Sequence, residues 1–259
     1  KASIHLDLSG CTLESNTVSL GGTFKDCHCL VSVIVPEGIL YTGDEVFMGC
    51  INLSSVQLPE SLQIIFSSAF SGCSSLESIT IPPKVTTIGK NAFLNCSKLT
   101  SVVLPDKVSG IGTGSFSGCS SLQDIVITSK SRKYTYVSGI LFEQVPGGKA
   151  IHTYVKTGTV PLIPPDAVSI LERAFYNNTN LYSVIIPENI KTIGDEAFAY
   201  CSAMVSIEIP SSVSFAGRDV FKGCTSLQEI VMRKMRKVPP SWDKSWIGDI
   251  LYGIIKWQP

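Results

Sequence analysis

Several features that mark common functional classes are absent from this sequence. The 259 residues carry no excess of either charge, with 21 basic and 21 acidic side chains, and only 16% of the residues are charged. A general nucleic-acid binder needs a basic face, so we expect no nucleic-acid partner. No run of 18 apolar residues occurs, so we expect no transmembrane helix and no insertion into a membrane.

Targeting signals and recognised catalytic motifs are missing as well. The chain begins with Lys1 rather than Met and no signal-peptide pattern follows, so we take it as a mature or excised segment. The sequence contains no G-x-S-x-G, phosphate-binding loop or H-E-x-x-H motif. Its three histidines, His5, His28 and His152, are far apart in the chain.

Phenylalanine recurs every 23 residues along most of the chain. The series consists of Phe24, Phe47, Phe70, Phe93 and Phe116, and then of Phe175, Phe198 and Phe221. Three residues after each stands a cysteine, or asparagine once: Cys27, Cys50, Cys73, Cys96, Cys119, Asn178, Cys201 and Cys224. A fixed period of 20 to 30 residues is typical of a solenoid, in which one structural unit stacks on copies of itself.

The clearest repeat, residues 73–93, predicts the structure of one unit. Residues 76–81 alternate between apolar and polar, which indicates a short strand with Leu76, Ile79 and Ile81 facing inward. Pro82 offers no N–H and ends the strand. Residues 85–88 then bring the chain back across the core, and a helical turn is expected to start at Ala92.

The pattern C-x-x-L-x-x-I-x-I-P-x-x-V-x-x-I-x-x-x-A-F in these repeats resembles the BspA-like, or Treponema-type, leucine-rich repeat of bacterial surface proteins. Regular or near-regular copies cover roughly residues 24–128 and 160–232. The resemblance implies an α/β fold: a right-handed leucine-rich-repeat solenoid with a parallel concave β-sheet and short helical turns on the other side. It also implies a role in adhesion or host binding, since several members of the family act in this way.

One solenoid domain is expected to cover residues 1–259. We predict an N-terminal cap over 1–23, regular repeats over 24–128, an irregular long repeat over 129–159, regular repeats over 160–232 and a C-terminal cap over 233–259. Two apolar runs joined by Pro146-Gly147-Gly148 indicate a β-hairpin in the long repeat. The three tryptophans lie in the last segment, where we expect them to cover the final core layer; sugar binding by these rings is the alternative.

The stacking of repeats also constrains which of the nine cysteines can form disulfides. Those at the repeat position lie about one strand spacing apart, roughly 4.8 Å, with their Cβ vectors parallel rather than converging. We therefore predict a ladder of buried, reduced thiols and no metal site. Cys11 and Cys29 lie outside this ladder, and a disulfide involving one of them stays open.

Strand alternation selects the side chains that face outward on the concave sheet. The candidate binding residues are Ser32, Ser55, Gln57, Ser78, Thr80, Ser101, Val103, Asp124, Ser183, Ser206 and Glu208. A second candidate site is the long repeat, because insertions in repeat proteins gather on one face. Its tyrosines are Tyr134, Tyr136 and Tyr154; the alternative is a structural variant that changes the local curvature.

These patterns favour a non-catalytic module for protein interaction or adhesion at the cell surface or in the extracellular space. The expected partner is a protein surface or an extended polymer of a host or neighbouring cell, and the expected state is a monomer. We expect no cofactor. The alternatives are a spacer or scaffold segment of a larger exported protein, and a carbohydrate-binding module. Glu208 and Glu229 occupy adjacent strands but no cleft, so we expect no catalysis by paired carboxylates.

Overall fold

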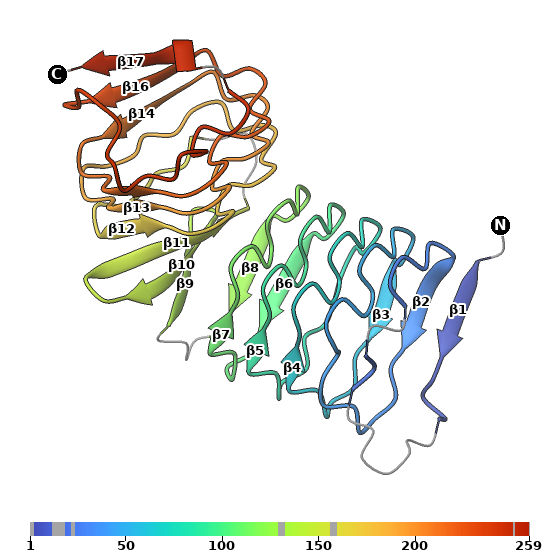
Figure 1. Ribbon diagram of the computed structural model, residues 1–259. Coiled ribbons are helices and arrows are strands. Elements are labelled where there is room, and N and C mark those ends of the chain that lie inside the picture. The colour runs from blue at the N-terminus through green and yellow to red at the C-terminus, as the bar shows by residue number, and fades with distance from the viewer. Residues whose placement is uncertain are drawn as a thin grey trace. The chain divides into compact units, whose positions relative to one another are not determined.

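The computed structural model describes residues 3–11, 19–21, 24–128, 133–155, 160–250 and 252–258. The chain divides into two compact units, residues 1–133 and 134–259, and each is a stack of coils joined by parallel strands (Figure 1). The single domain predicted over residues 1–259 stays a prediction. Among the described residues, no helix has the length and apolar character needed to span a membrane.

Unit 1 contains two ladders of parallel strands, because each coil passes through the β conformation twice. The long strands are β1 (Ile4–Asp7), β2 (Leu30–Ile34), β3 (Ser55–Gln57), β6 (Ser101–Leu104) and β8 (Asp124–Ile127). The short return strands are β4 (Ile64–Ile65), β5 (Thr87–Ile88) and β7 (Gly110–Ile111). Val33 pairs with Val56, and Ile88 with Ile111, so the register advances by the 23-residue period of the sequence in both ladders.

Unit 2 begins with the long repeat and continues with regular coils. One sheet has the order β15-β13-β12-β11-β10-β9 and a second has the order β14-β16-β17. Their strands are β9 (Tyr134–Val137), β10 (Ile140–Val145), β11 (Gly148–Tyr154), β12 (Ala167–Ile170), β13 (Thr192–Ile193), β14 (Ser206–Pro210), β15 (Phe215–Ala216), β16 (Glu229–Arg233) and β17 (Ile255–Gln258). The predicted hairpin is confirmed, since β10 and β11 are antiparallel; β9 extends it to three strands.

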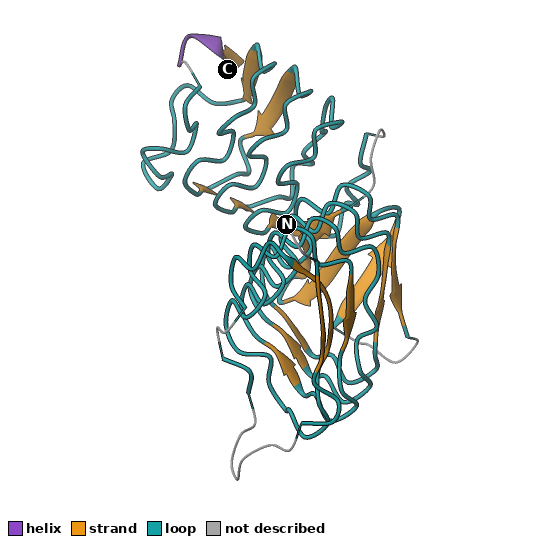
Figure 2. Ribbon diagram, turned by 90° about the vertical axis from the view of Figure 1, so that its right-hand side faces the viewer, coloured by secondary structure: helices purple, strands orange, loops and turns teal. Residues whose placement is uncertain are grey.

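The helical turns predicted after each return strand are wrong. The sole helix among the described residues is the 3₁₀ turn η1 (Tyr252–Ile254), and strands and loops make up the rest (Figure 2). The N–H of Met48 donates to Glu45 within the turn, but the N–H of Phe47 donates to Ala69 on the next coil. An α-helix would use these N–H groups internally. The fold is therefore a solenoid of β-strands and turns.

The phenylalanine series forms the centre of the core in both units. In unit 1 the Phe93 ring lies 5.3 Å from Phe70 and 5.5 Å from Phe116, at interplanar angles of 3° and 2°. In unit 2 Phe198 lies 4.9 Å from Phe175 and 5.7 Å from Phe221. These rings repeat because each coil places its phenylalanine at the same point, and offset stacking of aromatic rings stabilises the contact between coils.

The cysteine ladder lies beside the phenylalanines. All nine cysteines are free, which confirms the prediction of reduced thiols and leaves neither Cys11 nor Cys29 in a disulfide. The six buried ones are Cys50, Cys73, Cys96, Cys119, Cys201 and Cys224. Each donates its S–H to the carbonyl of the phenylalanine 26 residues earlier, for example Cys96 to Phe70 at 3.1 Å. The thiol therefore links one coil to the previous one.

Both ends of the chain depart from the repeat and cover its last layers. At the N-terminal end, β1 pairs in parallel with β2. At the C-terminal end, Trp242 and Trp246 are buried, and the Trp246 ring packs edge-on against Phe221 at 6.0 Å. These two tryptophans extend the core layer as expected, whereas Trp257 is 40% exposed on β17.

Two glycines of the same coil are expected to differ sharply in their tolerance of alanine. A Cβ at Gly112 would lie 2.3 Å from the backbone nitrogen of Lys90, so Gly112→Ala must push two coils apart. At Gly110 the nearest atom would be a Thr87 methyl group at 3.4 Å. We expect Gly112→Ala to lower the free energy of unfolding by about 2–3 kcal/mol or more, and Gly110→Ala by less than about 1 kcal/mol. Denaturant titration measures both, and equal losses would contradict the coil spacing described here.

Candidate binding surface

The outward side chains of the long strands form a surface that we call the strand face. The predicted inward and outward positions are confirmed in unit 1, where Leu53, Leu76 and Leu99 are fully buried. Ser55, Ser78 and Ser101 are exposed. Residues 78–80 hold the same position between β3 and β6 without forming a regular strand.

On unit 1 the strand face consists of two parallel rows of small and β-branched side chains. Paired strands align Ser32 with Ser55, and Ser101 with Asp124, in the first row. The second row contains Ile34, Gln57, Thr80, Val103 and Val126, of which all but the half-buried Ile34 are exposed. His5 on β1 extends the first row, with its Nδ1 atom 2.8 Å from the Ser32 hydroxyl. Asp7 on β1 extends the second row, because it pairs with Ile34, so Asp7 and Asp124 are the acidic residues of these two rows.

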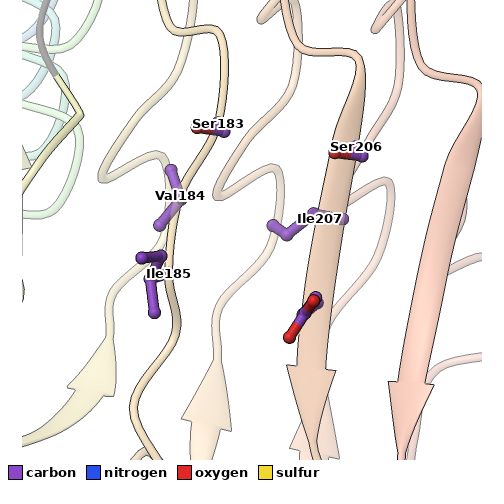
Figure 3. Close-up of a pocket in the computed structure, with 6 residues that line it drawn as sticks. Ser183, Val184, Ile185, Ser206 and Ile207 are labelled. Carbon is purple, nitrogen blue, oxygen red and sulfur yellow. The ribbon is translucent and has the colours of Figure 1, made fainter. Parts of the chain in front are cut away.

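On unit 2 the strand face is more apolar and less regular. Ser183 and Ser206 are half-buried, Glu208 is exposed, and Ile185 is 70% exposed. On this face the pairing of the two coils is limited to an isolated bridge between Ile185 and Glu208, whereas β14 and β16 pair over five residues. The face is hollowed here by a pocket of about 140 Å³ lined by residues 183–185 and 206–208 (Figure 3).

Acidic and basic side chains meet at the end of this hollow. The Arg233 guanidinium on β16 lies 2.6 Å from Glu188 and 3.5 Å from Glu208. One guanidinium is therefore shared by two carboxylates, and Glu208 has the longer contact. Arg233 belongs to the dense basic run at residues 233–237.

Three exposed residues of unit 2 were not predicted from the repeat pattern. Val160 and Leu162 hold the outward strand positions of the long repeat, because Pro161 and Ile163 beside them are buried. Leu162 is 81% and Val160 52% exposed. Tyr182, which follows the leading leucine Leu181, is 64% exposed. Counting back 23 residues from Ser183 and Ile185 leads to Val160 and Leu162. The repeat motif is hard to recognise there because Pro161 replaces the usual Ile or Val.

The tyrosines of the long repeat, the second candidate site, do not form an exposed cluster. Tyr134 and Tyr154 are buried, and Tyr136 is half-buried. The Tyr154 ring lies 5.4 Å from Phe175 and continues the aromatic stack of unit 2. Tyr154 was missed as a core residue because it precedes Phe175 by 21 residues, not 23. The long repeat thus supplies a layer of the core.

Many serine and threonine side chains have a structural role. Their hydroxyls donate to carbonyl groups one coil earlier, as Ser97 does to Ser74 at 3.3 Å and Thr100 to Glu77 at 3.2 Å. Further members of this set are Ser54, Ser74, Thr86, Ser109, Ser120 and Ser214. None of these eight belongs to the predicted binding residues, so the abundance of hydroxyl groups partly reflects contacts between coils.

The geometry offers an extended surface for contact rather than an arrangement of reactive groups. Among the described residues, no three His, Cys, Asp or Glu side chains lie close enough to hold a metal ion. His5 lies on the strand face, whereas His152 is buried beside Thr153, with 3.0 Å between Nδ1 and Oγ1. The strand face can bury apolar area and form hydrogen bonds with a large partner.

A family model described as the BspA type leucine-rich repeat region matches this chain in six copies, over residues 21–144 and 159–240. A search of curated proteins gives no match. The match covers the regular coils of both units and includes β9 and part of β10, but ends before the last strand, β17.

Solved structures of bacterial leucine-rich-repeat proteins share the fold at low sequence identity. A leucine-rich cell surface protein from Faecalibacterium prausnitzii is 21% identical, with a TM-score of 0.57, and the alignment covers 93% of this chain and 85% of that one. The pneumococcal vaccine antigen PcpA is 20% identical, with a TM-score of 0.66 and coverage of 89% and 66%. A repeat protein from Eubacterium ventriosum is 20% identical, with a TM-score of 0.62 and coverage of 90% and 73%.

Proposed function

Because the chain belongs to the family of BspA-type leucine-rich repeat proteins, we propose that it is a non-catalytic interaction module that binds a protein surface or an extended polymer through its strand face. The observation that carries the proposal is the composition of that face. Leucine-rich repeats of both units turn small polar and β-branched side chains outward, and Val103, Val126 and Ile185 are exposed there. Exposed apolar side chains gathered on one face are typical of interaction sites.

We also propose that the module acts at a bacterial cell surface. The structure from Faecalibacterium prausnitzii is described as a cell surface protein, and PcpA is described as a vaccine antigen. Both share the fold over most of this chain. Adhesion to a host or a neighbouring cell is the specific activity that we infer from this location.

Binding across unit 1 is expected to be lost when two charges are placed on its strand face. Thr80→Arg together with Val103→Arg puts long cationic side chains in neighbouring coils of a row in which Asp7 is the charged residue, and should abolish binding of a partner that covers it. The measurement is a partner screen with the wild-type chain, followed by affinity measurements on the double variant. Because this part of the face carries few charges, the wild-type affinity should change by less than about tenfold between 50 and 500 mM salt.

A matched control adds the same two charges elsewhere on unit 1. Ile51→Arg with Gln63→Arg changes two exposed neutral residues that lie outside the long strands, and is expected to bind normally. Circular dichroism spectra should show that both variants keep the fold. If both double variants bind like the wild type, the binding site lies outside the strand face of unit 1. If the screen finds no ligand for the wild-type chain, a spacer role replaces the proposal.

A further inference from the structure

Building on the proposed function, we propose that Val160, Leu162, Tyr182 and Ile185 form a docking site for an amphipathic helix of a partner protein. We call these four residues the apolar patch. In this arrangement two apolar side chains of the helix cover Leu162 and Ile185. A basic side chain one turn further along meets Glu208.

The four side chains are unusually exposed for their types. Their exposed fractions range from 52% for Val160 to 81% for Leu162. The predominantly polar outward residues of unit 1 offer no comparable group of large side chains, since Val103 and Val126 are its largest fully outward apolar residues. A contiguous apolar patch on a soluble domain marks an interaction surface.

Contiguity of the patch follows from the register of the coils that carry it. Ile170 pairs with Ile193 on the return strands, so the coil of Leu162 stacks on the coil of Ile185 with the 23-residue step. The Asn189 side chain donates to the carbonyl groups of Pro165 and Ala167, which holds the two coils together just beyond the patch. Leu162, Ile185 and Glu208 therefore occupy the same outward row on three successive coils.

The face is also hollowed next to Ile185. Figure 3 shows Val184 and Ile207 on neighbouring coils, with Ser183 and Ser206 at corresponding positions. On this face a single bridge pairs the two coils, and the pocket between them is lined by Val184, Ile185 and Ile207 together with two serines and Glu208. A depression of this kind can receive a side chain of a partner.

The spacing of the row favours a helix over an extended segment. Parallel strands lie about 4.8 Å apart, whereas one helical turn advances about 5.4 Å and two residues of an extended chain advance about 6.7 Å. Over the two steps from Leu162 to Glu208, a helix drifts out of register by about 1.2 Å and an extended chain by about 3.8 Å. Only the helix keeps three side chains of one face above three successive coils.

The charges at the end of the row specify a basic residue in the partner. Glu208 and Glu188 share the single guanidinium of Arg233, and Glu208 has the longer contact, at 3.5 Å. The group of three therefore carries a net negative charge, and the Glu208 side chain is 56% exposed. A lysine or arginine of the partner helix, placed one turn after the two apolar residues, neutralises this net negative charge.

The test uses two displayed libraries as probes for the full chain. One presents 20-residue helices with one randomised face, and the other presents proline-containing extended peptides of the same length. We expect enrichment from the helix library of sequences with apolar residues three or four positions apart, followed one turn later by Lys or Arg. Ile185→Asp should weaken these binders at least about tenfold, because a central apolar contact is lost and a charge is desolvated.

Two further variants test whether the selected helices recognise the apolar patch and Glu208 rather than any exposed position of the chain. Glu208→Arg should change the preferred residue of the selected helices from basic to acidic. Ile51→Asp, at an exposed position of unit 1 outside the strand face, should leave their affinity unchanged. Enrichment of extended peptides, of helices without the pattern, or of helices that bind Ile185→Asp normally would overturn the inference. Binders that are lost with the Thr80→Arg and Val103→Arg pair but not with Ile185→Asp would overturn the inference and leave the proposed function standing. Binders unaffected by either would overturn both.

Discussion

Raising the pH from 8 to 10 is expected to remove about 8 kcal/mol from the free energy of unfolding, which is comparable to the entire stability of a typical domain. The cause is the ladder of six buried thiols. Burial raises the pKa of Cys50 from 9.0 to about 11 and the pKa values of Cys119 and Cys224 to about 12. Burial also raises the pKa values of Cys73, Cys96 and Cys201 well above 9.0.

The direction of the effect follows from the protons bound in each state. Above pH 9 the thiols of the unfolded chain lose their protons while the folded ladder keeps them, so stability falls as the pH rises. Each such thiol contributes about 1.4 kcal/mol per pH unit until the folded pKa is reached. The contribution is fully present below pH 9 and is lost between pH 9 and about 11 or 12.

Denaturant titrations at intervals between pH 7.5 and pH 10.5, under reducing conditions, measure this slope. Cys96→Ala removes one titrating thiol and should make the slope shallower by about 1.4 kcal/mol per pH unit, although its stability at pH 8 is lower. Asn178 shows that the ladder position does not require an ionisable group. A free energy of unfolding that stays constant up to pH 10 would mean that the native thiols are hydrated and that the ladder is misplaced.

Phe93→Ala is expected to lower the free energy of unfolding by about 4–8 kcal/mol. The ring is fully buried between Phe70 and Phe116, so its removal leaves a cavity and ends two stacking contacts. Truncation of a buried phenylalanine typically costs about 3–5 kcal/mol, and each aromatic pair adds about 0.5–1.5 kcal/mol. Because each coil contacts mainly its neighbours, the loss should also uncouple the coils on either side and broaden the unfolding transition of unit 1.

Thermal unfolding measures the loss of stability and the breadth of the transition, and amide hydrogen exchange measures the uncoupling of the coils on either side of Phe93. Phe215→Ala makes the same chemical change on β15, where the ring is 43% exposed and outside the stack, and should cost less than about 1 kcal/mol. Similar losses for the two variants would show that the phenylalanine stack does not govern the coupling of coils.

Much of the fold was predictable because the sequence is periodic. The 23-residue step of the phenylalanines determines the strand register, so that Val33 pairs with Val56 and Ile207 with Ile230. Alternation within each strand determines which side chains face inward, and it correctly placed Leu76 in the core and Ser78 on the surface. The hairpin at Pro146–Gly148 was also predictable, because its turn residues form a local signal.

Other features required the tertiary structure, because they depend on which neighbour a group meets. Sequence pattern indicated a helical turn near Phe47, but its N–H donates to Ala69 on the next coil, and this competition is invisible within a single repeat. Tyr154 entered the phenylalanine stack from a position outside the period. Tyr182 stands out only through its exposure in the structure, since the repeat pattern assigns it no outward position. Periodicity therefore determined the core of the regular coils, whereas the tertiary structure decided how Tyr154 joins that core, the hydrogen bonding of the turns and the surface left open to a partner.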